Sequence, residues 1–286
     1  MQTATILAHA KLNLYLDVLG RRPDGFHRLE TVFQTIALHD ELHLVRDPSG
    51  RGISLTCDQP GIPADATNLV WRAAAAFVHG REAQAGAIAL HLRKGIPHGA
   101  GLGGGSSDAA ATLRLLDHLL PGWHDALSLH TIAAALGSDV PFFLVGGTAL
   151  GEERGEILTP LADAVTMPVT VLMPCERLPT PAVFAALTED ERGPRVGRGV
   201  AWWRTHLASD PWSAILHNRL TGAAVRLCPA VGDVLAHLQR QGVPCLMSGS
   251  GAACFALGPC APPPDVSVWQ SSFIGRATAL APPVPG

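Results

Sequence analysis

The sequence predicts a mixed α/β protein of the α+β type, because strand-like and helix-like patterns both recur along it. Residues 11–18 place an apolar side chain at every second position, which is the period of a half-buried strand. Residues 109–120 carry apolar side chains three or four positions apart, which is the period of a helix. With 286 residues and 47% hydrophobic side chains, the chain can bury the core of one large domain or of two closely joined ones.

The first half of the chain is expected to alternate strands with helices. Pro-Asp-Gly at positions 23–25 sets a turn and predicts a projecting loop. Alanines along residues 68–79 predict a helix with Asn68 as its amino-terminal cap. A glycine-rich turn then precedes the helix of residues 109–120. The strands expected in this half are residues 3–8, 11–18, 31–38, 41–46, 53–56 and 87–92.

The second half begins with a helical pattern near residues 127–136, followed by paired strands in residues 148–158 around Arg154 and Gly155. We expect a domain boundary between residues 157 and 158. Residues 188–199, rich in charge and glycine, are the expected loose connection, and the terminal PPVPG is expected to fray. The remaining predicted elements are strands at 169–173, 245–247 and 252–257, and helices at 181–187, 218–227 and 231–241.

Composition excludes several classes of function. The net charge of -3 gives no overall basic field for nucleic acid, so an acidic ligand would need a local site. The apolar stretch at residues 133–150 is interrupted by Asp139 and Pro141, which argues against a membrane span. The first 13 residues lack a secretory pattern, so a cytoplasmic protein is expected, with monomer and homodimer both open.

Cysteine and histidine spacing predicts no disulfide framework and no zinc site. The six cysteines, which include Cys175, are scattered and contain no CxxC pair. The 13 histidines show no compact ligand spacing. Reduced thiols are therefore expected, and most of the histidines are expected in the core or on the surface.

Residues 97–108, PHGAGLGGGSSD, place five glycines and two serines directly before a helix. Glycine lets backbone amides approach an anion closely, and a helix amino terminus adds unpaired N–H groups and a favourable dipole. The segment therefore predicts a phosphate-binding loop, although a flexible turn with a helix cap remains open. The candidate residues are Pro97, His98, Gly99, Ala100, Gly101, Leu102, Gly103, Gly104, Gly105, Ser106 and Ser107.

Two familiar phosphate motifs do not describe this loop. Gly99, Gly101 and Gly104 satisfy GxGxxG, but a dinucleotide site also needs a strand directly ahead and an acidic residue about 20 positions later, at the end of a second strand. A Walker A loop needs GK[ST], which does not occur here. Phosphate binding therefore needs another architecture.

The loop resembles the defining motif of the GHMP kinases, Pro-x-x-x-Gly-Leu-Gly-x-Gly/Ser-Ser-Ser. The blocks AKLNLYLDVLGRRPDGFHRLETVFQ, GSDVPFFLVGG, GEILTPL and MSGSGAACFAL make the resemblance closer to the diphosphocytidyl methylerythritol kinase branch and sample nearly the whole chain. The resemblance implies a two-domain GHMP kinase fold, with an ATP-binding domain at residues 1–157 and a substrate-binding domain at residues 158–286. The ATP and substrate cleft would lie between them.

The resemblance also implies roles for three polar residues. Asp139 alone could simply cap a helix, but the matching aspartate in the family is the expected catalytic base that accepts the substrate hydroxyl proton. Lys11, in the AKxN motif, would stabilise charge near the attacking oxygen, and Asn13 would orient the substrate beside it. Lysine is rare here: of 21 basic side chains only Lys11 and Lys94 are lysines.

The same branch implies a nucleobase site. Phe26 and His27 follow the Pro-Asp-Gly turn, and the family usually carries Tyr where Phe26 stands, so a stacking face remains while a hydroxyl contact is lost. Phe184 would face the other side of a cytosine, with Thr180 near the substrate. Lys94 is a candidate nucleotide contact. Residues 248–252, SGSGA, resemble the third GHMP motif, and both a site role and a tight packing turn remain open.

The expected activity is γ-phosphoryl transfer from ATP to the C2 hydroxyl of the diphosphocytidyl methylerythritol substrate, with Mg²⁺ accompanying ATP. Ser107 is a plausible metal ligand and Asp108 a weaker one, and no protein metal ligand is assigned. The alternatives are a GHMP kinase for mevalonate, homoserine or a sugar, and a nucleotide-binding regulator without catalysis. Neither a nucleic acid nor a membrane partner is expected.

Overall fold

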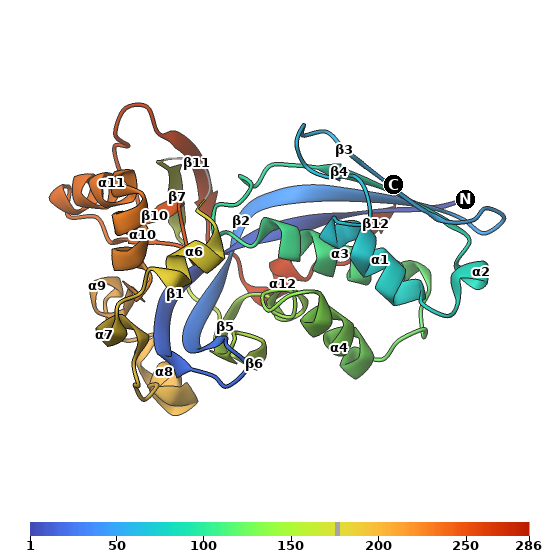
Figure 1. Cartoon of the computed structure of the whole chain (residues 1–286). Helices are drawn as coiled ribbons and strands as arrows, with labels where there is room; N and C mark the ends of the chain where they lie inside the picture. Colours follow the sequence, from blue (N-terminus) through green and yellow to red (C-terminus); the bar gives the residue numbers. More distant parts are fainter. Residues whose placement is uncertain (175–177, 286) are drawn as a thin grey trace.

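The computed structural model describes residues 1–174 and 178–285, so the predicted reduced thiol of Cys175 lies outside the described residues. Two sheets organise the chain (Figure 1). The first is eight-stranded and is dominated by two long antiparallel strands, β1 (Gln2–Arg21) and β2 (His27–Asp47), which form a curved ribbon. Its other strands are β3 (Ile53–Cys57), β4 (Ala87–Arg93), β5 (Thr148–Glu153), β6 (Ile157–Pro160), β8 (His217–Asn218) and β12 (Val284–Pro285).

The sequence predicted two separate strands within each of β1 and β2, and this was wrong. Both run without a break, and irregularities of register absorb the apparent interruptions, among them a shift between His9 and Lys11. Such a shift bends a strand without ending it. Because side chains alternate along a strand, Lys11 and Asn13 lie on one face of β1 while Leu12 and Leu14 lie on the other, in the core.

Helices α1 (Leu69–Val78) and α3 (Gly104–Leu119) cover one face of the first sheet, and α4 (Ala126–Leu136) packs against these two helices (Figure 1). Their apolar stripes bury Phe77, Leu113 and Leu116 completely. As predicted, Asn68 caps α1, accepting a hydrogen bond from the Val70 N–H. The helix periodicity of the sequence therefore identified the layer that packs under the sheet.

The second, four-stranded sheet has the order β11 (Ser267–Ser272), β7 (Pro168–Met173), β10 (Cys254–Leu257), β9 (Cys245–Met247). Alternate side chains of β7 and β10 serve two cores. Val171 and Phe255 face the β1–β2 ribbon, whereas Leu172 and Ala256 face the helical side. The helices on that side are α6 (Thr180–Ala185), α10 (Thr221–Leu227) and α11 (Pro229–Arg240).

Two predictions near the end of the chain were wrong for the same reason. Asn218, predicted to begin a helix, belongs to β8 and pairs with Leu16 of β1, so α10 begins later. Within the terminus predicted to fray, Val284 and Pro285 instead form β12 at the edge of β1, where Val284 pairs with Thr5, and Gly286 lies outside the described residues. In both cases pairing with a distant strand overrides the local pattern. Since β6 spans the predicted boundary and β8 and β12 return to the first sheet, the division at residue 157 stays a prediction.

Several short elements were not predicted. The segment predicted as a loose connection contains α7 (Glu189–Arg192), closed by a capping box between Thr188 and Glu191. The amino terminus of α8 (Gly199–His206) is held by the buried Glu30 carboxylate, which accepts from the Gly199 N–H and from Trp203 Nε1. The others are α2 (Glu82–Ala85), α5 (Phe142–Val145), α9 (Trp212–Ile215) and α12 (Arg276–Ala279). In the described ranges, none of the helices combines the length and the apolarity that crossing a bilayer demands.

Candidate active site

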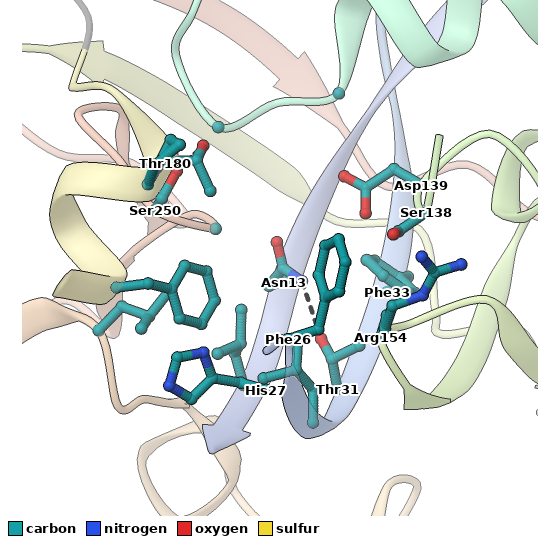
Figure 2. A pocket seen from close by; sticks show the side chains of 18 of the residues that line it. Asn13, Phe26, His27, Thr31, Phe33, Ser138, Asp139, Arg154, Thr180 and Ser250 are labelled. Atoms are coloured by element: carbon teal, nitrogen blue, oxygen red, sulfur yellow. Dashed lines mark hydrogen bonds between the residues drawn. The ribbon is translucent and has the colours of Figure 1, made fainter. Parts of the chain in front are cut away.

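A pocket of about 800 Å³ opens between the β1–β2 ribbon and the second sheet. Its walls come from β1, β2 and their connecting turn, from the glycine loop before α3, from the segment before α5, and from α6 and the turn after β9. These parts are far apart in the sequence and meet only in the folded chain (Figure 2). The predicted site residues that line the pocket are Lys11, Asn13, Phe26, His27, Gly101, Gly103, Asp139, Thr180 and Phe184.

Lys11 is the polar centre of one end of this pocket. Its side chain is almost fully buried, and its ammonium donates hydrogen bonds to Asn13 Oδ1 at 2.7 Å and to the Gly101 carbonyl at 2.9 Å. Asp139 Oδ2 lies 3.5 Å from the same nitrogen, and a third of the Asp139 side chain is exposed to the pocket. The Asn13 amide in turn donates to Thr31 Oγ1 at 2.8 Å, which fixes its orientation. A buried cation and an accessible carboxylate are therefore held side by side.

The glycine loop meets the turn after β9 at this point. Gly101 has a positive φ of 78°, and a Cβ there would lie 2.3 Å from the Ser248 carbonyl oxygen. Ser248 Oγ donates to the Gly101 carbonyl at 3.2 Å. A Cβ on Gly249 would come within 3.3 Å of the Lys11 ammonium. The two interpretations left open for residues 248–252 are thus compatible, because the tight packing itself brings this turn to the pocket.

Asn218 supports the same turn and was missed by the sequence analysis. Its buried amide donates to the carbonyls of Met247 at 2.7 Å and Gly249 at 2.8 Å, and its Oδ1 accepts from the Leu220 N–H at 2.9 Å. Both N–H donors of the side chain and one lone pair of its oxygen are used within the protein. A lone Asn before a helix pattern looks like a cap, so the sequence held no signal for this role.

The geometry of the glycine loop suits a phosphate group. Gly103, the N-cap of α3, has a φ of 74°, and no side chain caps the helix, so the first backbone N–H groups of α3 remain available. A Cβ on Gly103 would lie 2.7 Å from the Phe143 ring and 3.1 Å from Lys11 Cγ, so only glycine fits there. Of the loop residues, Gly101 and Gly103 line the pocket, while Ala100 and Leu102 are buried in the core beneath it.

The rest of the predicted loop borders this segment. Gly104, Gly105, Ser106 and Ser107 form the first turn of α3, and Pro97, His98 and Gly99 form the turn that leads into the loop. Ser107 is buried, and its hydroxyl donates to the His9 carbonyl at 2.6 Å, so it does not face the pocket.

Lys94 has a structural setting that the sequence analysis did not foresee. Its ammonium forms ion pairs with Asp40 and with Asp108, the latter at 2.8 Å, and its side chain is only 5% exposed. It is not part of the pocket wall. Asp40 also accepts the backbone N–H groups of Gly95 and Ile96, at 2.7 and 2.8 Å. Burial raises the pKa of the Asp108 carboxyl well above its usual range, although the neighbouring ammonium opposes the shift.

The described part of the chain contains no cluster of side chains arranged to bind a metal ion. No group of three or more His, Cys, Asp or Glu side chains that could hold an ion occurs among residues 1–174 and 178–285. The two residues considered as ligands, Ser107 and Asp108, are both buried. The Ser107 hydroxyl donates to the His9 carbonyl and Asp108 Oδ2 accepts from Lys94, whereas Asp108 Oδ1 has no hydrogen-bond partner within the described structure.

Aromatic side chains line the opposite end of the pocket. His27 stacks on Phe184, with ring centroids 5.0 Å apart and planes at 24°, and Phe26 is 52% exposed. Thr180 Oγ1 and Ser250 Oγ are 2.8 Å apart on the neighbouring wall (Figure 2). Burial lowers the pKa of His27, and the positive charges of Arg21 and Arg192 lower it further, which favours the neutral imidazole. His27 Nε2 is buried and has no hydrogen-bond partner within the described structure.

Comparison with known proteins connects this architecture to one family. Residues 68–147, which include the glycine loop and Asp139, match the family described as GHMP kinases N terminal domain. A 4-diphosphocytidyl-2-C-methyl-D-erythritol kinase from Pelotomaculum thermopropionicum is 40% identical over 256 residues, covering 88% of each chain. The protein of the same name from Synechococcus strain JA-3-3Ab is 47% identical over 177 residues, and this match spans 55% of its length.

Solved structures give the same result. A crystal structure of 4-(cytidine 5'-diphospho)-2C-methyl-D-erythritol kinase superposes with a TM-score of 0.76 at 36% identity, covering 95% of this chain and 99% of that one. A homoserine kinase from Cytophaga hutchinsonii, at 18% identity and a TM-score of 0.69, shares the fold. These likenesses confirm the predicted α+β GHMP kinase fold. The chain belongs to the 4-diphosphocytidyl-2-C-methyl-D-erythritol kinase family of GHMP kinases.

Proposed function

We propose that this chain transfers the γ-phosphoryl group of ATP to the C2 hydroxyl of 4-diphosphocytidyl-2-C-methyl-D-erythritol and releases ADP and the 2-phosphate. The observation that carries the proposal is the position of the Lys11 ammonium, 2.9 Å from the Gly101 carbonyl of the glycine loop and 3.5 Å from Asp139 Oδ2. This arrangement places a cation and a carboxylate where the loop meets the pocket. The proposal places the reaction in the cytoplasm and requires no nucleic acid, membrane or partner protein.

Asp139 is the proposed base. As the acceptor hydroxyl oxygen attacks the γ-phosphorus, its proton passes to the Asp139 carboxylate, the new P–O bond forms, and the bond to the ADP oxygen breaks. Lys11 holds its charge beside the attacking oxygen and the transferred group, and burial keeps this charge effective. Asn13, fixed by Thr31, orients the acceptor. Positioning of the two reactants supplies much of the acceleration.

The glycine loop is the proposed site for the ATP phosphates. Uncapped N–H groups at the start of α3 and the positive end of the helix dipole both favour an anion there. Mg²⁺ bound with ATP would neutralise charge on the phosphates. Because the candidate protein ligands, Ser107 and Asp108, are buried and do not line the pocket, we assign none. Lys94 is retained only as a support for this loop, because its ammonium is occupied by two carboxylates.

The aromatic end of the pocket is the proposed site for the cytosine. Phe26 and Phe184 offer faces for stacking, which is favourable for any planar base. The neutral His27 imidazole has an unpaired buried nitrogen and can exchange a hydrogen bond with the base edge. Thr180, beside Ser250, offers a hydroxyl to the sugar. A substrate that joins a pyrimidine to an alcohol would occupy both ends of the pocket.

The test is Mg²⁺-dependent ADP formation by purified protein, with the diphosphocytidyl methylerythritol substrate, mevalonate, homoserine and galactose supplied in parallel. Selective turnover of the first is the expected result. Turnover of another acceptor would keep the kinase activity and reject the substrate. Binding of ATP without ADP formation from any acceptor would instead favour a nucleotide-binding regulator.

A further inference from the structure

Arg154 lies in the tight turn between β5 and β6 and projects into the pocket. The Glu156 carboxylate fixes it at two points, accepting from the Arg154 backbone N–H at 2.7 Å and from its Nε at 3.0 Å. Gly155, with a φ of 104°, lets the chain turn sharply enough for the two residues to face one another. Among the guanidinium nitrogens, only Nε is bonded to Glu156, so the two terminal amino groups make no hydrogen bond to that carboxylate.

The turn between β1 and β2 contacts the turn between β5 and β6 that carries Arg154. The Arg154 guanidinium lies over the Phe26 ring, 5.1 Å from its centroid, and Arg22 forms an ion pair with Glu153. The turn that presents Phe26 is thereby connected to the turn that presents Arg154. Figure 2 shows Arg154 beside Phe26, on the side of Ser138 and Asp139, while His27 lies on the other side of Phe26.

The charge around the pocket is unbalanced. Lys11, Arg21, Arg154 and Arg192 line it, whereas Asp139 is its one lining carboxylate among the described residues. Lys11 is neutralised locally by Asp139, and both Arg21 and Arg192 lie close enough to His27 to lower its pKa. Neither terminal amino group of Arg154 has a hydrogen-bond partner in the described structure, and its side chain is 30% exposed. Guanidinium N–H groups that lack a partner within the protein favour an anionic ligand.

We propose that Arg154 binds the diphosphate of the acceptor and so selects a nucleoside diphosphate ester over a neutral alcohol. The inference rests on the proposed function, in which the base lies at the aromatic end and the hydroxyl beside Asp139. The diphosphate that joins them can reach the Arg154 guanidinium, which lines the same pocket and lies over the Phe26 ring. The planar pair of amino groups of this guanidinium matches two phosphate oxygens. Arg154 is a specificity-determining residue in this role, and it takes no part in proton transfer.

The experiment compares binding of CDP with binding of cytidine, which lacks the phosphates. Both are titrated calorimetrically into the full chain with a non-hydrolysable ATP analogue at saturation, so that CDP cannot occupy the glycine loop. Arg154→Gln should weaken CDP about 10- to 100-fold, the usual effect of losing charge-assisted hydrogen bonds, and change cytidine less than about twofold. Arg154→Lys, which keeps the charge and loses the fork, should fall between the two.

Two comparison variants separate the competing explanations. Phe26→Ala should weaken CDP and cytidine by the same factor, because it removes stacking. If Arg154→Gln behaves in that way, Arg154 acts only by supporting Phe26, and the inference is overturned. Arg192→Gln removes an equal charge from the same pocket. An equal loss of CDP affinity in this variant would show that net charge, and not the position of Arg154, attracts the ligand.

Failure of this inference is distinguishable from failure of the proposed function, because the binding experiment requires no turnover. Wild-type turnover of the cytidyl substrate, combined with normal CDP binding by Arg154→Gln, would overturn the role of Arg154 alone. Absence of wild-type turnover would overturn the proposed function. The KM for ATP should stay within about twofold in Arg154→Gln, and a large rise would place Arg154 on the donor phosphates instead.

Discussion

Replacement of Lys11 by methionine tests the polar centre of the site most directly. The ammonium satisfies two oxygens that lie at 2.7 and 2.9 Å, the amide of Asn13 and the carbonyl of Gly101. Methionine has a similar length and no donor, so it preserves most of the packing and removes both bonds. The Asp139 carboxylate loses its cation but stays hydrated, because a third of its side chain is exposed.

The loss of stability follows from these contacts. A hydrogen bond from a charged donor contributes about 1.5–3 kcal/mol, so losing two in a buried setting should lower the free energy of unfolding by about 3–6 kcal/mol. At about 2 °C per kcal/mol for a chain of this size, the melting temperature should fall by about 6–12 °C. The loss of charge stabilisation should also reduce kcat about 10²- to 10³-fold.

Asp139→Asn is the matched comparison, because it alters the other member of the same pair. An ion pair that is 3.5 Å long and partly exposed contributes about 1 kcal/mol or less, so the melting temperature should move by no more than about 2 °C. Loss of the proposed base should nevertheless reduce kcat about 10²- to 10⁴-fold with ATP binding retained.

Both variants are measured by thermal unfolding and by initial rates of ADP release at a temperature where each is folded. A Lys11→Met protein that melts within about 2 °C of the wild type would refute the claim that Lys11 joins β1 to the glycine loop. Near-normal turnover by Asp139→Asn would remove the proposed base. If both variants lose activity but only Lys11→Met loses stability, the result supports a structural and catalytic role for Lys11 and a catalytic role alone for Asp139.

Three further predictions follow from the described contacts. Gly101→Ala should be clearly less stable than Gly122→Ala. Both positions have nearly equal positive φ, 78° and 79°, but only at Gly101 would the new Cβ meet a backbone oxygen at 2.3 Å. Equal melting temperatures of the two variants would contradict this prediction. Asn218→Ala should lower the free energy of unfolding, measured by urea denaturation, by about 2–4 kcal/mol, because two buried carbonyls lose their donor. An unchanged urea midpoint would show that water replaces the Asn218 amide. Burial, together with the electrostatic effect of His39, lowers the pKa of His9 to about 4. As the pH falls from about 6.5 to 4, the His9 imidazole therefore binds a proton in the unfolded chain but not in the folded one. Stability should therefore decline by up to about 3 kcal/mol across that interval, and His9→Gln should show a shallower decline of melting temperature; parallel curves would contradict it.

The sequence identified elements best where the pattern was local and long. The helix stripe after the glycine loop, the cap at Asn68 and the paired strands around Arg154 were all confirmed. Each depends on neighbours within a few positions along the chain, whose spacing the sequence displays directly. The fold family was likewise predicted from short motifs and confirmed by the comparisons.

The sequence failed where a distant segment determined the outcome. β12 exists because Val284 finds the edge of β1 at Thr5, and Asn218 is a strand residue because it pairs with Leu16. Nothing near positions 284 or 218 displays these partners. The contact of Lys94 with a nucleotide stays a prediction, but nothing near position 94 displays the two carboxylates from other elements that surround its ammonium.

The sequence by itself determined which chemical groups the protein can bring to a site: a glycine loop before a helix, a lysine and an asparagine two positions apart on a strand, and an isolated aspartate. Tertiary structure alone decided that they meet. Lys11, Gly101 and Asp139 become neighbours because β1, the loop before α3 and the segment before α5 come together at the pocket. The physical reason is that side-chain spacing encodes local conformation, whereas a contact across more than a hundred residues depends on the packing of every element between them.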